Sequence, residues 1–327
     1  MPESAAPTIT MGRPWSSLTR LGLQLRRGDA LAHAIALVFG ASVLVVTGLL
    51  AWQLWVNSVL PRRQFGWRFL FSQTWDPVAG QFGAAAFVYG TVMTSALALL
   101  IAVPLGIGVA IFLAELAPPR LSAMAGMLLE LLAAVPSVIY GLVGVSILVP
   151  IMRVYVQPAL KAATGGFPLF SGPAYGIGLL TAGIVLAVMV VPFIVSVGRE
   201  VLLAVPREQR EAALALGSTR WESTWKVVLP YARPGLYGAV FLALGRALGE
   251  TMAVTMVIGN RPEIAASLFA PAYSMAAVIA NEFSEATEEL YLQSLIEVGL
   301  VLFALTMVIN VVARGLIAAT ADQGSAR

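Results

Sequence analysis

Long apolar segments alternate with shorter polar segments along most of the 327-residue chain. A helix needs about 20 predominantly apolar residues to cross the hydrocarbon core of a bilayer, and the apolar segments meet that requirement. The pattern predicts about six membrane-spanning helices, over residues 31–55, 84–113, 121–152, 176–198, 235–259 and 290–319. The sequence therefore indicates an all-α integral membrane protein with both ends on one side of the membrane.

Proline divides the third of these segments. Pro136 lies inside 121–152, so we expect a short helix that carries Glu130, joined to a span that begins at Ser137. The first segment is longer than the apolar core of a signal peptide, about 7–15 residues, and is predicted to be a retained span. Segments too polar to cross the bilayer are expected outside it, as exterior loops or surface helices at 60–83, 154–175 and 261–289.

The polar stretch 199–234, called the elbow below, separates two spans and predicts a short helix in its first half. Pro206 suits the first position of that helix, because its missing N–H would have no partner there. Glu208 in the same turn complements the positive end of the helix dipole. Gly217 can adopt the left-handed conformation that ends a helix, so the helix is expected to end there.

A second short helix is predicted in the other half of the elbow. Thr219 is followed three residues later by Glu222, which is the pattern of a capping box. Pro230 is expected to end this helix, because proline removes a backbone donor and clashes with the preceding turn. A helix pair between two spans has the form of a docking element, and a plain solvated connection is the alternative.

Basic residues are more numerous on one side of the predicted spans. If the N-terminus is inside, 13 Lys and Arg residues lie on the cytoplasmic side and six on the exterior side. This bias fits the positive-inside rule. We therefore expect a cytoplasmic N-terminal tail at 1–30, a membrane domain at 31–320 with the elbow on its cytoplasmic side, and a C-terminal tail at 321–327.

The composition restricts the function further. Hydrophobic residues make up 59% of the chain and charged residues 11%, which is too few to cover a soluble globule of this length. The net charge is only +3 and the arginines are scattered singly at segment ends, so nucleic-acid binding is not expected. The chain has no cysteine and one histidine, which argues against disulfides, zinc sites and Cys or His nucleophiles.

The two lysines argue against a nucleotide site. A phosphate-binding P-loop has glycine directly before its lysine, whereas Lys161 follows Leu160 and Lys226 follows Trp225. We therefore predict that the chain is not an enzyme, that it has no catalytic residues and no metal ligands, and that it does not hydrolyse ATP by that route.

Arg246 and Glu250 are the candidate residues for chemistry inside the membrane. Arg246 falls near the middle of 235–259, where an ionised side chain costs about 2.5–3.5 kcal/mol on insertion scales. Glu250 follows one helical turn later, so the two are expected to pair when no substrate is present. The pair is either a structural ion pair between subunits or an anion site, because the planar guanidinium matches the oxygens of phosphate.

Two further carboxylates lie in apolar sequence. Glu130 and Glu297 are each expected near the lipid headgroups, where solvation keeps the cost of a charge small. Proton sensing or pairing with an arginine is the alternative for both.

The elbow resembles the EAA loop of bacterial ABC-importer permeases. The resemblance rests on Glu211-Ala212-Ala213, Gly217 and Leu229-Pro230 at the family spacing, with valine at 227 where the family more often has isoleucine. It implies that the loop inserts into a groove on a separate ATPase subunit. The ATPase-coupling residues that it implies are Glu211, Ala212, Ala213, Gly217, Leu229 and Pro230.

Other motifs resemble the PstC-type subunit of phosphate importers in particular. They are Arg246-Ala-Leu-Gly-Glu250-Thr, the stretch 257–262 and the stretch 267–271, and the resemblance covers residues 65–314. It implies the type I ABC-importer permease (MetI-like) architecture in the bacterial inner membrane and the import of inorganic phosphate. It also implies that Arg246 and Glu250 line the substrate pathway.

The same resemblance implies partners. They are a second homologous permease subunit of the PstA type, a dimeric ATP-binding subunit of the PstB type that carries ATP and Mg, and an extracytoplasmic phosphate-binding protein of the PstS type. Membrane lipids surround the chain, which itself is expected to hold no cofactor.

Three other functions are weighed against phosphate import. A permease for sulfate or molybdate would share most of these features. An ion-coupled secondary transporter would show an internal repeat with paired broken helices and charges on several spans, and the sequence shows no clear repeat. A membrane scaffold without transport would leave Arg246 and Glu250 unexplained.

Overall fold

The computed structural model describes residues 15–165 and 167–325, and within these ranges the secondary structure is helical apart from two isolated β-bridges. The chain divides into two compact units, Met1–Gln53 and Leu54–Arg327. The first unit holds most of α1 (Trp15–Val56), whose apolar part Leu31–Val56 is long enough to span a membrane. The helix begins inside the predicted tail 1–30, of which residues 1–14 lie outside the described part.

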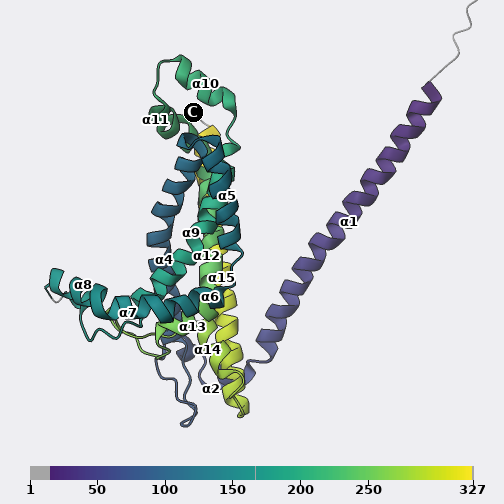
Figure 1. The fold of residues 1–327 in the computed structure, drawn as a ribbon. Helices are drawn as coiled ribbons and strands as arrows, with labels where there is room; N and C mark the ends of the chain where they lie inside the picture. The colour runs from purple at the N-terminus through teal and green to yellow at the C-terminus, as the bar shows by residue number, and fades with distance from the viewer. Residues whose placement is uncertain (1–14, 166, 326–327) are drawn as a thin grey trace, which may run out of the picture. The chain divides into compact units, whose positions relative to one another are not determined.

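Four long helices of the second unit run side by side (Figure 1). They are α4 (Ala85–Ile111), α9 (Leu179–Leu203), α12 (Leu229–Leu248) and α15 (Glu289–Ser325). α4 and α9 pack along most of their lengths, and α12 contacts each of the other three. These contacts make α4, α9 and α12 the frame on which the shorter helices are placed.

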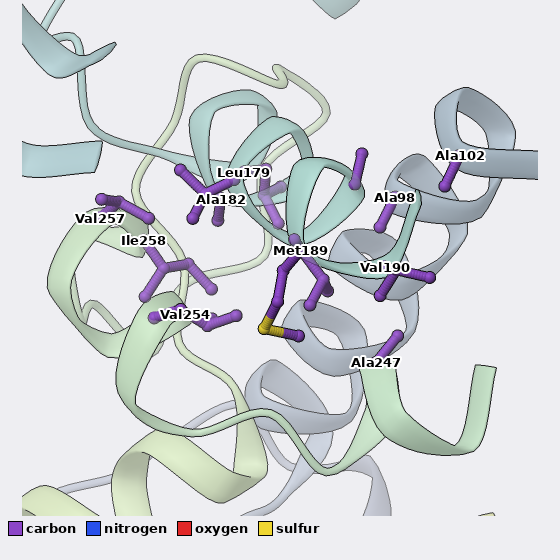
Figure 2. Close-up of a cluster of buried hydrophobic side chains, with 14 of the residues drawn as sticks. Ala98, Ala102, Leu179, Ala182, Met189, Val190, Ala247, Val254, Val257 and Ile258 are labelled. Atoms are coloured by element: carbon purple, nitrogen blue, oxygen red, sulfur yellow. The ribbon is translucent and has the colours of Figure 1, made fainter. Parts of the chain in front are cut away.

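Small residues allow α4 and α9 to approach closely. A Cβ added at Gly106 of α4 would lie 2.6 Å from Cγ2 of Ile194 in α9, and one at Gly183 of α9 would lie 2.8 Å from Cβ of Leu97 in α4. Figure 2 shows Ala98 and Ala102 of α4 in the same buried cluster as side chains of α9, α12 and α13. Van der Waals contact between small residues is a main source of helix association in membranes, because lipid offers no hydrophobic driving force.

The third predicted segment is divided at proline, as the sequence indicates. α5 (Pro119–Ala133) packs against α9 and ends before Pro136, and α6 (Ser137–Val143) follows. The chain then stays helical to Ala163 through the elements η2 (Gly144–Leu148), α7 (Val149–Ile151), η3 (Met152–Val156) and α8 (Gln157–Ala163). In Figure 1 the stretch from α6 to α8 runs crosswise to α4 and α9.

The prediction of an exterior loop at 154–175 is therefore wrong for its first part. Residues 154–163 are helical, because a wider turn precedes each proline. The Val149 N–H donates to the Gly144 carbonyl and the Gln157 N–H to the Met152 carbonyl, each five residues back, and these turns accommodate Pro150 and Pro158. The irregular part begins after Ala163 and contains Gly165, which adopts a left-handed backbone.

The predicted fifth span, 235–259, has both bounds misplaced. The continuous helix begins upstream at α11 (Arg220–Ser223), continues through η5 (Thr224–Val228) into α12, and ends at Leu248. A break at residues 249–251 separates it from α13 (Met252–Ile258), which ends at Gly259 in a left-handed conformation. The break is decisive for the candidate site, because Arg246 and Glu250 no longer belong to one helix.

The outer segments are built around an aromatic cluster. α2 (Val59–Gln64) and α3 (Arg68–Phe71) precede a loop whose Trp75 packs edge-on against Phe82 and Phe87. In the segment 261–289, α14 (Met275–Glu282) was expected to be a surface helix, but Met275, Ala277 and Val278 are fully buried in this cluster. That prediction is wrong, because short apolar stretches here pack against α4 and α15 instead of lying on the surface.

The described residues contain six helices that are long and apolar enough to cross a membrane. Their bounds are Leu31–Val56, Ala85–Leu116, Ser137–Ala163, Leu179–Leu203, Arg220–Leu248 and Glu289–Gly315. The prediction of an all-α membrane protein with about six spans is confirmed.

Candidate functional site

The first half of the elbow folds as the local sequence predicts, with a shift of one residue. α10 (Arg207–Ala215) begins after Pro206, which is the extended N-cap residue rather than the first helical residue, and Glu208 lies in the first turn. The helix ends with Gly217 at φ +87°. The N–H of Gly217 donates to the carbonyl of Leu214 (2.9 Å) and the N–H of Ser218 to that of Ala213 (3.2 Å), which is a Schellman motif.

The second half contains the predicted capping box. The Glu222 N–H donates to Oγ1 of Thr219 (3.2 Å), and the Thr219 N–H donates to Oε2 of Glu222 (3.0 Å). The prediction that Pro230 ends this helix is wrong. The Leu229 N–H donates to the Thr224 carbonyl five residues back, and this wider turn lets the chain enter α12 with Pro230 in its first turn.

The six predicted coupling residues divide into an exposed and a supporting group. Glu211, Ala212 and Gly217 are exposed, whereas Ala213 is buried and Leu229 and Pro230 are half-buried. The sequence pattern does not include Leu216, whose side chain is 89% exposed beside Gly217. A single exposed leucine is common on protein surfaces, and the sequence pattern gives no signal that this leucine is exposed.

Arg246 and Glu250 do not pair, so that prediction is wrong. Ion pairs among the described residues join Arg199 to Glu200, Arg210 to Glu115 and Lys226 to Glu222. Arg246 lies exposed in the last turn of α12, whereas Glu250 lies in the break after it. Oε1 of Glu250 instead accepts from the N–H of Ala253 (3.1 Å) in the first turn of α13.

Tyr140 of α6 joins this region, although the sequence did not indicate it. Its hydroxyl donates to the Leu132 carbonyl near the end of α5 (2.8 Å), across the break at Pro136. A Cβ at Gly141 would lie 3.1 Å from Cα of Ala253, so α6 and α13 are in close contact and bring the two helix breaks together.

The two further carboxylates differ from each other. Glu130 is exposed on the surface of the chain, and its solvation near the headgroups stays a prediction. Glu297 of α15 is only 5% exposed and its Oε2 is buried without a hydrogen-bond partner, so the expectation of a solvated side chain is wrong for this residue. Its position follows from α15 packing against α2 and α14, which the apolar pattern of the segment does not specify.

A sequence profile of the family described as "Binding-protein-dependent transport system inner membrane component" matches residues 102–321. The chain belongs to this family. The matched region includes α9, the elbow, α12 and both helix breaks, so the exposed elbow and the Arg246 region are parts of the family domain.

Several curated relatives are named as phosphate transport permeases. A phosphate transport system permease protein PstC of Mesorhizobium japonicum is 50% identical over 316 residues, which cover 95% of this chain and 95% of that protein. The PstC of Pasteurella multocida is 51% identical and covers 77% of this chain and 80% of its own length. A probable PstC of Methanocaldococcus jannaschii is 38% identical, with 78% and 83% covered.

Solved structures share the fold at low identity. A chain of the inward-facing MetNI methionine ABC transporter matches with a TM-score of 0.54 at 20% identity, over 72% of this chain and 96% of that chain. A chain of a bacterial ABC transporter that imports alginate matches with a TM-score of 0.54 at 16% identity, over 92% and 99%. The predicted ABC-importer permease architecture is thus confirmed.

Proposed function

We propose that the chain is the transmembrane permease subunit of an ATP-driven importer of inorganic phosphate, where it forms the translocation pathway and couples to a separate ATPase. The observation that carries the proposal is the identity of about half of the residues, over nearly the whole chain, with a protein named as a phosphate transport permease. The chain itself is then a non-catalytic subunit.

In this proposal, the elbow couples ATP hydrolysis on the ATPase subunit to transport. Glu211 and Ala212 are exposed in α10, and Gly217 is exposed in the Schellman turn that ends this helix. The capping box of Thr219 and Glu222 starts the next helix directly after that turn, so hydrogen bonds define the connection before a partner binds. A preorganised surface loses less conformational entropy on binding. The partner is a dimeric ATP-binding subunit of the PstB type that carries ATP and Mg.

The substrate meets Arg246 in the pathway. The guanidinium is exposed in the last turn of α12 and makes no ion pair with Glu250, which accepts from the Ala253 N–H instead. Its donors are therefore not used by this carboxylate. A guanidinium binds phosphate through two parallel hydrogen bonds, which a lysine cannot reproduce. Glu250 holds the start of α13 and keeps a negative charge beside the site, which makes binding of an anion transient.

The remaining partners complete the importer. They are a second permease subunit of the PstA type and an extracytoplasmic phosphate-binding protein of the PstS type, in the lipid of a bacterial inner membrane. Both termini and the elbow face the cytoplasm, where ATP is available. A sulfate or molybdate permease is the alternative, because tetrahedral oxyanions share the geometry that Arg246 recognises.

Reconstitution of the complete importer in proteoliposomes tests the proposal. The binding protein is added with phosphate, sulfate or molybdate, and ATP hydrolysis is measured together with uptake of the labelled anion. Phosphate is expected to stimulate both. Stimulation by sulfate or molybdate, with none by phosphate, would assign the chain to a different oxyanion.

A further inference from the structure

Arg210 of α10 connects the elbow to the membrane helices. Its guanidinium forks onto the carboxylate of Glu115, with Nη2 2.8 Å from Oε1 and Nε 3.2 and 3.3 Å from Oε1 and Oε2. Nη2 also donates to the Leu202 carbonyl (2.7 Å), and Nη1 donates to the Val205 carbonyl. One side chain therefore makes contacts to two segments other than its own helix.

The two segments are the cytoplasmic ends of α4 and α9. Glu115 lies in η1 (Phe112–Leu116), which continues α4, and Leu202 lies in the last turn of α9. A cation there satisfies carbonyls that have no partner within the helix and complements the negative end of the dipole. Arg210 thus fixes α10 to the ends of the two helices that pack most extensively in the second unit.

The pair is shielded from water. The side chains of Arg210 and Glu115 are 20% and 11% exposed, whereas those of the surface pair Lys226 and Glu222 are 73% and 44% exposed. A shielded charge is costly to leave without its partner, so the fork holds more firmly than a surface ion pair. The link therefore acts as a fixed joint rather than as a fluctuating surface contact.

The main packing contacts of α10 lie within the elbow. Among the described residues, Arg210 is the side chain of α10 with hydrogen bonds to the membrane helices, and the rest of α10 packs on α11 and η5. The next residue, Glu211, is exposed. Arg210 is thus directed to the ends of α4 and α9, whereas Glu211, about 100° further round the helix, is exposed.

We propose that the Arg210–Glu115 pair is the positioning link through which movement of α10 is transmitted to α4 and α9. The proposal rests on the proposed function, because it concerns how the ATPase moves the pathway. α12 packs against both α4 and α9, and Arg246 lies in its last turn. A rigid shift of α4 and α9 would therefore move α12 and, with it, Arg246. The Arg210–Glu115 pair does not contact Arg246 directly.

The test compares single substitutions in the complete reconstituted importer. Arg210→Gln and Glu115→Gln should keep co-purification with the ATPase and basal ATP hydrolysis, because the exposed face of α10 is intact. Stimulation of ATP hydrolysis by the loaded binding protein should fall by about 5–150-fold, the usual range for coupling between two sites, and uptake should fall with it. Arg210→Lys should recover only part of the stimulation, because an ammonium cannot form the fork.

Lys226→Gln is the matched control. It removes one positive charge from the elbow and breaks an exposed ion pair that does not reach α4 or α9, so stimulation should stay at the wild-type level. Wild-type stimulation in Arg210→Gln would overturn the proposal. Loss of ATPase co-purification in that variant would also overturn it, since Arg210 would then serve docking or assembly.

A second test restores the link in the same protein sample. The chain has no cysteine, so Glu115→Cys combined with Arg210→Cys supplies one thiol on each side. A bifunctional thiol reagent that a reductant releases should restore binding-protein stimulation and uptake when attached, and reduction should remove both. Each single cysteine variant, treated alike, controls for modification without linkage. Cross-linking that leaves uptake at the unlinked level would contradict a transmitting role.

These tests separate the link from the substrate assignment. If the wild-type importer responds to another oxyanion and not to phosphate, the proposed function fails. The link is then measured with the oxyanion that does stimulate the wild type.

Discussion

At the scale of single residues, the position of Arg246 at a helix end lowers the cost of its charge. The partial negative charge of the α12 C-terminus favours a cation in its last turn. Glu250 is held by the backbone of α13 instead. In the proposed pathway, an arriving anion would therefore not have to displace Glu250 before it reaches Arg246.

Arg246→Gln should abolish phosphate uptake while the complex still assembles. Glutamine keeps hydrogen-bond donors but loses the charge and the two-pronged geometry, so the anion is no longer held. Arg246→Lys should restore uptake in part, because it returns the charge alone. Uptake of labelled phosphate and co-purification of the partner subunits are the two measurements. An assembled Arg246→Gln complex with wild-type uptake would exclude a pathway role.

Glu250→Gln provides the contrast. A glutamine side-chain oxygen can still accept from the Ala253 N–H, so α13 keeps its cap and uptake should fall less than in Arg246→Gln. Glu250→Ala removes the acceptor and should lower the stability of the folded protein by about 0.5–2 kcal/mol, the usual cost of a lost cap. Thermal unfolding in detergent separates the two effects. An equal loss of uptake in Glu250→Gln and Arg246→Gln would show that the carboxylate charge itself is required.

The sequence identifies these residue types more readily than their geometry. Arg246 and Glu250 are conspicuous because charges are rare in apolar segments, but their pairing was inferred from helical spacing, which the break at Gly249 removes. Tyr140 could not be found this way, since its hydrogen bond to Leu132 and the contact of its helix with α13 depend on tertiary packing. Burial of Glu297 likewise depends on which neighbours pack against α15.

At the scale of elements, the elbow was the most predictable part, because its signals are local. The Schellman ending at Gly217 and the capping box of Thr219 and Glu222 each involve residues within one or two turns. Pro230 was wrongly expected to end a helix, because the effect of a proline depends on the turn that precedes it. Proline stops a helix only when the turn before it cannot adjust, and here the wide turn of η5 does adjust.

Gly217→Val should disturb the end of α10 through backbone strain alone. The residue has φ +87°, where a β-branched side chain costs about 1–2 kcal/mol, and a Cβ there would meet no atom within 4 Å, so a clash is not the cause. We expect weaker co-purification of the ATPase and reduced uptake, with normal insertion in the membrane. Gly217→Asn is the matched control, because asparagine tolerates this conformation and should retain most activity. Wild-type coupling in Gly217→Val would mean that the elbow is a permissive connection.

Two glycines of α4 offer a matched pair for the packing of the frame. A Cβ at Gly106 would lie 2.6 Å from Ile194, whereas a Cβ at Gly108 would meet nothing within 4 Å. Gly106→Ala should therefore lower the thermal stability of the purified protein, because α4 and α9 must separate. Gly108→Ala should be neutral or stabilise the protein by up to about 1 kcal/mol, since alanine is the better helix former. Equal unfolding temperatures for the two variants would contradict close contact at Gly106.

At the scale of the whole molecule, composition and apolar pattern were enough for the class and the number of spans. They could not place the ends of the fifth span or the buried first turn of α14, because both depend on neighbours that are distant in sequence. The Arg210–Glu115 ion pair was likewise not predictable from the sequence, since the two residues are 95 positions apart in the chain. A single sequence carries no periodic signal for contacts at such separations, and the resemblance to a family supplied the architecture instead.

The orientation of the molecule in the membrane is predicted from the bias of 13 basic residues against six. Ala215 of α10 is exposed, and Val78 is fully exposed in the loop before α4. In Figure 1 the elbow lies at one end of α4 and α9 and this loop at the other end. Three candidate spans separate the two positions, so an odd number of crossings places them on opposite sides.

Cysteine labelling tests this orientation, because the chain has no cysteine of its own. A membrane-impermeant maleimide should label Val78→Cys from the exterior and Ala215→Cys only in inside-out vesicles. The reversed result would place the elbow away from ATP and contradict coupling to a cytoplasmic ATPase. Labelling of both positions from one side would show that Ser137–Ala163, whose helices run crosswise to α4 and α9, does not complete a crossing with α5. The number of spans inferred from apolar length would then have to be reduced.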